Sequence, residues 1–250
     1  MMSLPVNKKR RKRRILIAFV IFTSLLVVLW FAGRITGAFQ FYRIPSSSME
    51  PALKPASLIF ATNLKKPKRN DIIVFKRIIT EKEGFTESGK KLSFTYRLIA
   101  FGGETVQIKN GLAYVNGELM DDSTRLQFTY MVEKKDIEKV ATALKKDLND
   151  LLLSPMTYFQ EQNQFVLTLT YKEFLVVKEF TNPVKELSDD FTNELFENNN
   201  EKNWKVNNYG PIIIPSNCYF VLGDNRCFSF DSRFHGPIPE KDFIGVVLWK

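Results

Sequence analysis

Two serines near the N-terminus are the residues of this chain best suited to covalent chemistry. Ser46 and Ser48 belong to the segment Ser-Ser-Ser-Met-Glu-Pro at residues 46–51. A serine hydroxyl has almost no anionic form at neutral pH, so a nucleophilic serine needs a nearby base and donors that hold an oxyanion. A triad would have to use His235, the only histidine in the sequence. The other solution is a lysine whose pKa falls because apolar neighbours remove water from its ammonium.

The segment before these serines has the pattern of a membrane anchor. Residues 15–33 contain no charged side chain and only two polar ones, Thr23 and Ser24. As a helix they would cover roughly 28 Å, about the thickness of the hydrocarbon layer of a membrane. The stretch is longer than the apolar core of a typical cleaved signal, and no Ala-x-Ala-like site follows it. We therefore expect a retained transmembrane helix at 15–33.

The distribution of charge sets the expected orientation of this helix. Every residue from 8 to 14 is Lys or Arg. Because basic flanks stay on the cytoplasmic side, we expect residues 1–14 to form a cytoplasmic tail. The remainder would then lie on the extracytoplasmic side of the cell (inner or plasma) membrane, which the chain crosses once. The whole chain carries +9, but residues 35–250 hold 28 basic and 27 acidic residues, so no nucleic-acid-binding surface is implied.

The composition gives little support for a metal site or for a disulfide. The chain has one histidine and two cysteines, Cys218 and Cys227. Two cysteines alone make no closed metal site, so we expect no metal site. The expected compartment permits a disulfide, but the spacing of the cysteines leaves their pairing open.

The rest of the chain has mostly strand character. Asn110-Gly111 and Asn116-Gly117 are hairpin signals, because both central positions of such turns have positive φ. Residues 136–153 instead repeat their apolar positions at helical spacing. The fold class predicted is a mostly β, antiparallel catalytic body at 34–119 and 209–250, with an α+β insertion (cap) at 120–208. Segments rich in β-branched and aromatic residues are expected as strands, at 57–62, 71–79, 93–101, 104–108, 112–115, 165–170, 174–180, 212–215, 218–222 and 243–249.

Three segments, in order, resemble the sequence boxes of bacterial type I signal peptidases (leader peptidases). Residues 45–53 match the serine box, with Ser48 in the nucleophile position and Ser46 where the side-chain oxyanion donor lies. Residues 70–75 match the strand box that follows. Residues 223–239 match the final box, which includes the sequence Gly-Asp-Asn-Arg. The matches cover the two ends of the chain and about half its length.

The resemblance implies a membrane-bound serine endopeptidase that cleaves signal peptides from exported precursor proteins without a cofactor. Asp231 and Arg233 would form an ion pair that braces the site, and Ser229 would orient the base. Membrane lipid and precursor proteins are the expected partners, and a contact with the protein translocation machinery is compatible with them.

One box departs from the family pattern. Residues 96–104 read Tyr-Arg-Leu-Ile-Ala-Phe-Gly-Gly-Glu, which places Tyr96 where the family has its general-base lysine. Arg97 cannot replace it, because it stays protonated and points to the other face of a strand. Three readings stay open. Another lysine could supply the base, from Lys76, Lys90 or Lys91; Tyr96 could act weakly through Ser229 or water; or the chain is a catalytically silent homologue that binds peptides without cleaving them.

Overall fold

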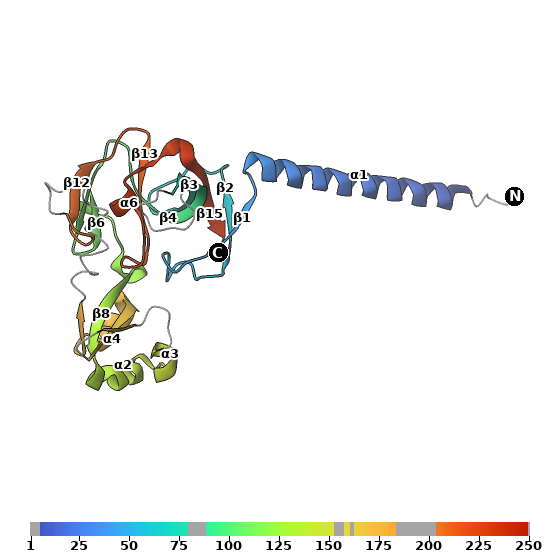
Figure 1. Ribbon diagram of the computed structural model, residues 1–250. Helices are drawn as coiled ribbons and strands as arrows, with labels where there is room; N and C mark the ends of the chain where they lie inside the picture. Colours follow the sequence, from blue (N-terminus) through green and yellow to red (C-terminus); the bar gives the residue numbers. More distant parts are fainter. Residues whose placement is uncertain (1–5, 80–88, 153–157, 161–162, 184–203, 250) are drawn as a thin grey trace.

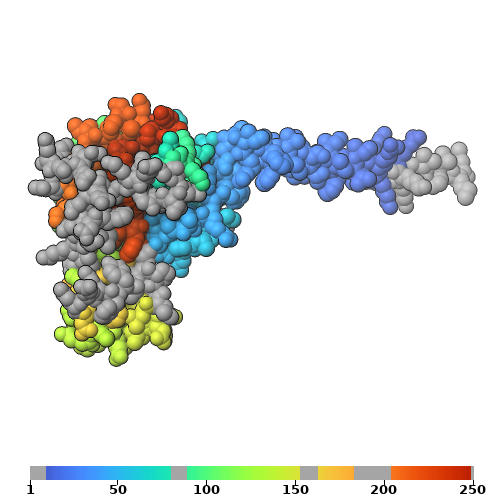
Figure 2. All heavy atoms as spheres, in the orientation of Figure 1, coloured from blue at the N-terminus to red at the C-terminus, as the bar shows by residue number. Residues whose placement is uncertain are grey.

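The computed structural model describes residues 6–79, 89–152, 158–160, 163–183 and 204–249. A long N-terminal helix, α1 (Val6–Thr36), projects away from a body made mainly of antiparallel strands (Figure 1). In the space-filling view the helix stands clear of the body except at its C-terminal end (Figure 2). The mostly antiparallel β fold with an apolar N-terminal helix agrees with the class predicted from the sequence.

The largest sheet in the described part of the chain carries the core of the body. Its buried side chains include Ile73, Phe75, Leu98 and Val221, each fully inaccessible to solvent. The expected strands in this region are present with ends shifted by one or two residues. In spatial order the sheet runs β1 (Gln40–Arg43), β2 (Leu58–Thr62), β15 (Phe243–Trp249), β3 (Ile72–Ile78), β4 (Lys91–Phe101), β13 (Cys218–Leu222) and β14 (Ile238–Pro239).

A second sheet packs its own core against β4 and β13. Both Asn-Gly turns form as expected, with φ of 51° and 79° at Asn110 and Gly111, and of 52° and 86° at Asn116 and Gly117. The order of its strands is β12 (Tyr209–Ile213), β5 (Thr105–Lys109), β6 (Leu112–Val115) and β7 (Glu118–Leu119).

A third sheet, here called the small sheet, lies at the end of the body together with three short helices (Figure 1). It has a separate core that includes Val140, Leu167, Leu169 and Val177. The small sheet has the order β11 (Thr181–Pro183), β8 (Gln127–Glu133), β10 (Gln164–Thr170) and β9 (Tyr158–Gln160), and the helices are α2 (Ile137–Leu144), α3 (Leu148–Leu152) and α4 (Tyr171–Val177).

Two sequence predictions are wrong in this region. The segment expected as a strand at 174–180 is mostly α4, because Thr170 and Glu173 form a capping box that starts a helix. The single helix expected at 136–153 is split into α2 and α3, since Lys145 adopts a left-handed conformation with φ of 54° and ends α2.

The C-terminal end of α1 is joined closely to the large sheet. The Phe39 amide donates to the Gly33 carbonyl at 3.0 Å, and the side chain of Asn63 donates to the Thr36 carbonyl at 2.6 Å. The Phe39 ring packs directly on Gly33, where a Cβ would lie only 1.9 Å from a ring carbon. These contacts place the start of β1, and hence the serine segment that follows it, close to the end of the apolar helix.

Candidate active site

A pocket of about 410 Å³ brings the serine segment and β4 together. The serine segment contributes Ser46 and Ser48 to the lining and is here called the serine side, and β4 contributes Tyr96 and is here called the β4 side. Most of the remaining lining is apolar. It consists of Tyr42, Arg43, Ile44, Pro45, Met49, Ile79, Leu92, Ser93, Phe94, Thr95, Phe228 and Phe230.

The serine segment is held in place by two buried apolar side chains. Met49 and Leu53 are each 1% exposed and pack in the core of the large sheet. The Leu53 amide donates to the Met49 carbonyl at 2.8 Å, so the chain turns immediately after the serines. The hydroxyl oxygens of Ser46 and Ser48 lie 3.1 Å apart and share a hydrogen bond. The two serines singled out from the sequence therefore meet at the pocket.

The main chain of Ser48 is fixed by the loop after β13. Its carbonyl accepts from the Asn225 amide at 3.1 Å and from the Ser229 hydroxyl at 2.9 Å. The Ser229 hydroxyl also lies 2.5 Å from the Asn225 carbonyl. The structure thus places Ser229 on the backbone of Ser48 and buries it at 5% exposure.

Asp231 and Arg233 form a fully buried ion pair beside this loop. Their side chains meet through two hydrogen bonds, of 2.8 Å from Nε and 2.9 Å from Nη2 of Arg233. The Asp231 carboxylate also accepts from the Gly223 amide at 3.0 Å, while Arg233 donates to the Arg226 carbonyl at 2.7 Å. Since each charge is paired and further hydrogen-bonded, the pair can brace the loop that holds Ser48.

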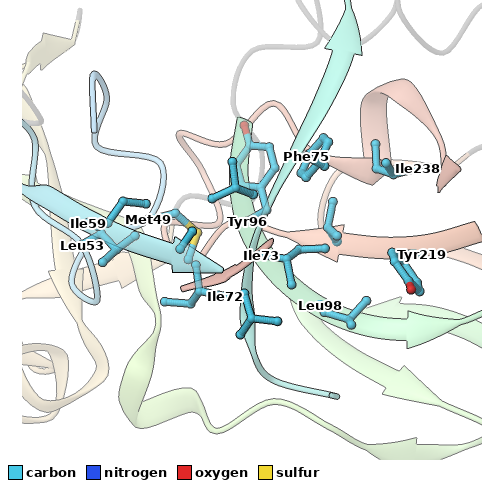
Figure 3. Packing of buried hydrophobic residues seen from close by; sticks show 14 of the residues in the cluster. Met49, Leu53, Ile59, Ile72, Ile73, Phe75, Tyr96, Leu98, Tyr219 and Ile238 are labelled. Atoms are coloured by element: carbon cyan, nitrogen blue, oxygen red, sulfur yellow. The ribbon is translucent and has the colours of Figure 1, made fainter. Parts of the chain in front are cut away.

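Tyr96 lies in the core of the large sheet, with its ring close to Phe75 and Met49 (Figure 3). Its hydroxyl donates to the Phe230 carbonyl at 3.0 Å. Burial raises the pKa of Tyr96 well above its usual value of 10, and the nearby Asp231 carboxylate raises this pKa further. A hydrogen bond with Ser48 and the charges of Arg77 and Arg233 lower it, but by less. The phenol is therefore neutral at physiological pH and acts as a hydrogen-bond donor.

The alternative bases lie elsewhere among the described residues. Lys76, Lys90 and Lys91 are all exposed, and none of the three lines the pocket. Lys91 is paired with Asp242 at 2.7 Å. His235 is also outside the lining, and its Nδ1 lies 2.8 Å from the Gly236 carbonyl. The described lining of the pocket thus holds no lysine, histidine or carboxylate.

Sequence reasoning missed a set of long-range contacts that surround the site. Arg97 points away from the pocket, as expected, and there binds the buried carboxylate of Asp224 through contacts of 2.7 and 2.5 Å. Arg226 binds Asp121 through two contacts of 2.6 Å, with both side chains almost fully buried. These partners are more than 100 positions apart, so no local pattern indicates them.

The two cysteines remain free thiols and do not form a disulfide. Among the described residues, no group of three or more histidine, cysteine or acidic side chains could hold a metal ion.

Comparisons with known proteins identify the family of the chain. The profile of the family described as "Signal peptidase, peptidase S26" matches residues 14–250. A signal peptidase I from Buchnera aphidicola is 26% identical, and the match covers 99% of this chain and 81% of that protein. A signal peptidase I from Aquifex aeolicus is 28% identical over 91% of this chain and 80% of its own length.

A solved structure also matches, although weakly. The crystal structure of a signal peptidase I from Enterococcus faecalis is 21% identical and covers 74% of this chain and 98% of its own, with a TM-score of 0.32. The family assignment rests on the sequence profile, which spans nearly the whole chain. The protein is a member of the signal peptidase family, peptidase S26.

Proposed function

We propose that this protein is a membrane-bound serine endopeptidase of the signal peptidase I type, which removes signal peptides from exported precursors. The observation that carries the proposal is the hydrogen-bonded pair Ser46–Ser48 in the lining of a largely apolar pocket. The class of reaction is inferred from the family to which the chain belongs. The loop that fixes the main chain of Ser48 supplies the rigidity that the reaction requires.

Ser48 is the proposed nucleophile. Its Oγ attacks the scissile carbonyl, a bond forms between the two, and the carbonyl oxygen becomes negatively charged. The Ser48 amide and the Ser46 hydroxyl are the donors that stabilise this oxyanion. Ser46 is suited to the task because its hydroxyl is already 3.1 Å from that of Ser48. When the intermediate that carries this oxyanion collapses, the scissile C–N bond breaks, and the new N-terminus of the mature protein leaves as an amine that takes a proton from water. A second water then hydrolyses the ester between Ser48 and the signal peptide, which releases the peptide and restores the Ser48 hydroxyl.

The substrate would bind in extended form between two extended segments of the enzyme. Residues 42–46 and residues 92–96 both line the pocket. Main-chain pairing holds an extended peptide without selecting its sequence, so specificity comes from the apolar side chains of the lining. In the family, small residues at the first and third positions before the cut fit such pockets.

Tyr96 takes the position of the general base, but its chemistry differs from that of a lysine. A phenol with a raised pKa that donates to Phe230 does not accept a proton at neutral pH. We propose that Tyr96 orients the Ser48 hydroxyl and that water takes its proton. Losing a positioned base costs about 10²–10⁴-fold in rate, so the reaction would be slow at neutral pH.

We propose that α1 anchors the enzyme with its N-terminus in the cytoplasm and the body outside. The part of α1 that could span a membrane is Arg10–Thr36, which contains 27 residues and has a mean hydropathy of 2.8 in its most apolar stretch. The basic run at 8–14 supports the orientation. Phe41 is 45% exposed, and its ring is tilted against that of Phe60, which stacks with Phe39 beside the end of α1. These rings would lie in the outer headgroup layer and contact lipid.

The activity is tested by incubating purified full-length protein in detergent with a precursor that carries an Ala-x-Ala site. We expect cleavage after the second alanine by the wild type and none by Ser48→Ala. Cleavage that is equal in the two proteins would contradict Ser48 as the nucleophile. Absence of cleavage by the wild type, and also by Tyr96→Lys, would contradict the proposed activity itself.

The orientation is tested separately by adding protease to intact spheroplasts. We expect the body to be digested and a membrane-embedded fragment that contains residues 1–33 to remain. Protection of the body in intact spheroplasts, or release of a soluble form that lacks residues 1–33, would contradict the proposed topology.

A further inference from the structure

The segment from Asp224 to Ser229 lies between the proposed nucleophile and the small sheet. On one side, the Asn225 amide donates to the Ser48 carbonyl at 3.1 Å, and its side-chain amide donates to the Ser47 carbonyl at 3.3 Å. On the other side, the segment pairs in parallel with the first residue of β8, which is Gln127. One short stretch of chain therefore contacts both the serine segment and the small sheet.

The contact with β8 is made by main-chain hydrogen bonds on both sides of Asn225. The Gln127 amide donates to the Asp224 carbonyl at 3.0 Å, and the Arg226 amide donates to the Gln127 carbonyl at 3.1 Å. Asp224, Asn225 and Arg226 are all at most 1% exposed. Because these residues are closely packed and have almost no contact with solvent, a shift of β8 has to move the main chain around Asn225 as well.

Two side-chain contacts reinforce the same junction. The hydroxyl of Thr129, which is 2% exposed, donates to the sulfur of Cys227 at 3.1 Å. Asp121, located just before β8, binds the guanidinium of Arg226 through two contacts of 2.6 Å. Arg226 also donates to the Gly223 carbonyl at 3.0 Å, next to the loop that carries the Asp231–Arg233 pair.

We infer that β8 positions the nucleophile: Thr129 and Asp121 act as positioning residues for Ser48 through the segment that contains Asn225. The inference rests on the proposed function in taking Ser48 as the nucleophile. Its physical basis is that two donors hold the Ser48 carbonyl and thereby fix the direction of the hydroxyl toward Ser46 and the substrate. A displacement of about 1 Å at such a position can cost about 10²-fold in rate.

The main test compares two buried threonines of the small sheet in the full-length protein. Thr129→Val removes the hydroxyl that contacts Cys227. Thr181→Val removes a hydroxyl on the adjacent strand β11, where Thr181 pairs with Val132 and has no hydrogen bond to the segment. We expect Thr129→Val to lower kcat about threefold to tenfold, the change that one hydrogen bond carries, with KM within about twofold. Thr181→Val should leave kcat unchanged, and Thr129→Ser should restore it.

A second pair of variants changes two neighbouring aspartates. Asp121→Asn weakens the contact with Arg226, whereas Asp122→Asn affects only the local turn with Thr124 and Arg125. We expect Asp121→Asn to lower kcat by up to about 10²-fold and Asp122→Asn to leave it unchanged. If Asp121→Asn does not fold, the comparison of Thr129→Val with Thr181→Val tests the inference by itself.

Hydrogen exchange measured by mass spectrometry gives a readout that does not depend on catalysis. We expect Thr129→Val to speed exchange in a peptide that contains residues 46–53, and Thr181→Val to leave this peptide unchanged. The exchange result decides the inference even if the precursor is not cleaved, so a failure of the proposed activity stays distinguishable. The inference is overturned if Thr129→Val changes neither kcat nor the exchange of residues 46–53. It is also overturned if, in a protein that cleaves the precursor, Thr129→Val changes the exchange but not kcat. Equal effects of Thr181→Val and Thr129→Val would overturn it as well.

Discussion

The two sides of the pocket differ in how well they suit peptide cleavage. On the serine side, Ser46 and Ser48 are hydrogen-bonded to each other, and a buried loop and ion pair hold the main chain behind them. On the β4 side, Tyr96 occupies the position that we propose for the base, and its hydroxyl donates to a carbonyl. We therefore propose that an aromatic residue has replaced the base while the serine side keeps its polar contacts.

The difference follows from how each side is built. The serine side depends on contacts between segments far apart in the sequence, so a change at one of them disturbs several others. Tyr96 lies on a continuous strand, and its ring adds to the core beside Phe75, with ring centroids 6.0 Å apart. A lysine in this place would have to bury an amine, whereas tyrosine buries mainly an aromatic ring.

The largest effect is expected from breaking the ion pair on the serine side. Asp231→Ala leaves the buried Arg233 guanidinium without its partner, and we expect a loss of about 3–5 kcal/mol in the free energy of unfolding. Asp136→Ala is the control, because Asp136 is paired with Lys139, whose side chain is 61% exposed, and this pair should contribute less than about 1 kcal/mol. Urea unfolding of both variants in mild detergent measures the difference. Equal midpoints for the two variants would contradict the bracing role of Asp231.

A smaller loss of stability, with a large loss of activity, is expected from crowding the loop that holds Ser48. A Cβ at Gly223 would lie 1.7 Å from the Ser229 hydroxyl and 2.6 Å from the Ser48 carbonyl. We therefore expect Gly223→Ala to cost about 1–3 kcal/mol and to lower precursor cleavage by about 10²-fold.

The matched control for this crowding is Gly117→Ala. No atom lies within 4 Å of a Cβ at Gly117, although its positive φ adds some strain. This variant should keep its cleavage rate. A Gly223→Ala enzyme as active as the control would show that the contact of Ser229 with Ser48 does not matter for activity.

On the β4 side, the raised pKa of Tyr96 predicts that the free energy of unfolding depends on pH in the alkaline range. Because the folded-state pKa of Tyr96 is raised, the folded protein keeps the phenolic proton at a pH where the unfolded chain releases it. The contribution of Tyr96 is therefore complete below pH 10, and above that the wild type should lose about 1.4 kcal/mol per pH unit relative to Tyr96→Phe. Unfolding of both proteins between pH 9 and 11.5 measures this. Parallel curves would show that Tyr96 is not held in its protonated form.

The smallest effect is expected from the exposed lysines. Lys76→Ala, Lys90→Ala and Lys91→Ala should each keep the cleavage rate within about twofold, because none of these side chains lines the pocket. A severe loss of activity in any one of these variants would identify that lysine as the base. The β4 side would then have a base that the described lining of the pocket does not contain.

Much of the fold could be predicted from the sequence, because its strongest signals are local. Segments rich in β-branched and aromatic residues and the turns at Asn110-Gly111 and Asn116-Gly117 indicated most strands of the large sheet and of the second sheet. The small sheet was harder to predict. Short apolar stretches such as 174–180 fit both a strand and a helix, and the capping box of Thr170 and Glu173 decides between them.

In the candidate site, too, the residues of local motifs could be predicted from the sequence, whereas the long-range contacts could not. Ser46, Ser48, Asp231 and Arg233 belong to short motifs, and the structure brings all four to the pocket or directly behind it. The contact of Asn225 with Ser48 joins segments 177 positions apart. Contacts over such distances depend on the tertiary arrangement of the sheets and leave no periodic pattern in the sequence.

The most direct test of the difference between the two sides is the rate of precursor cleavage by Tyr96→Lys. A lysine at this buried position is desolvated, which lowers its pKa and supplies a neutral amine beside Ser48. We expect cleavage of an Ala-x-Ala precursor to rise by one or more orders of magnitude over the wild type. The rate should increase with pH through the pKa of the new amine, and the double variant with Ser48→Ala should be inactive. A rate that is unchanged or lower in Tyr96→Lys would contradict the claim that the serine side is complete and lacks only its base.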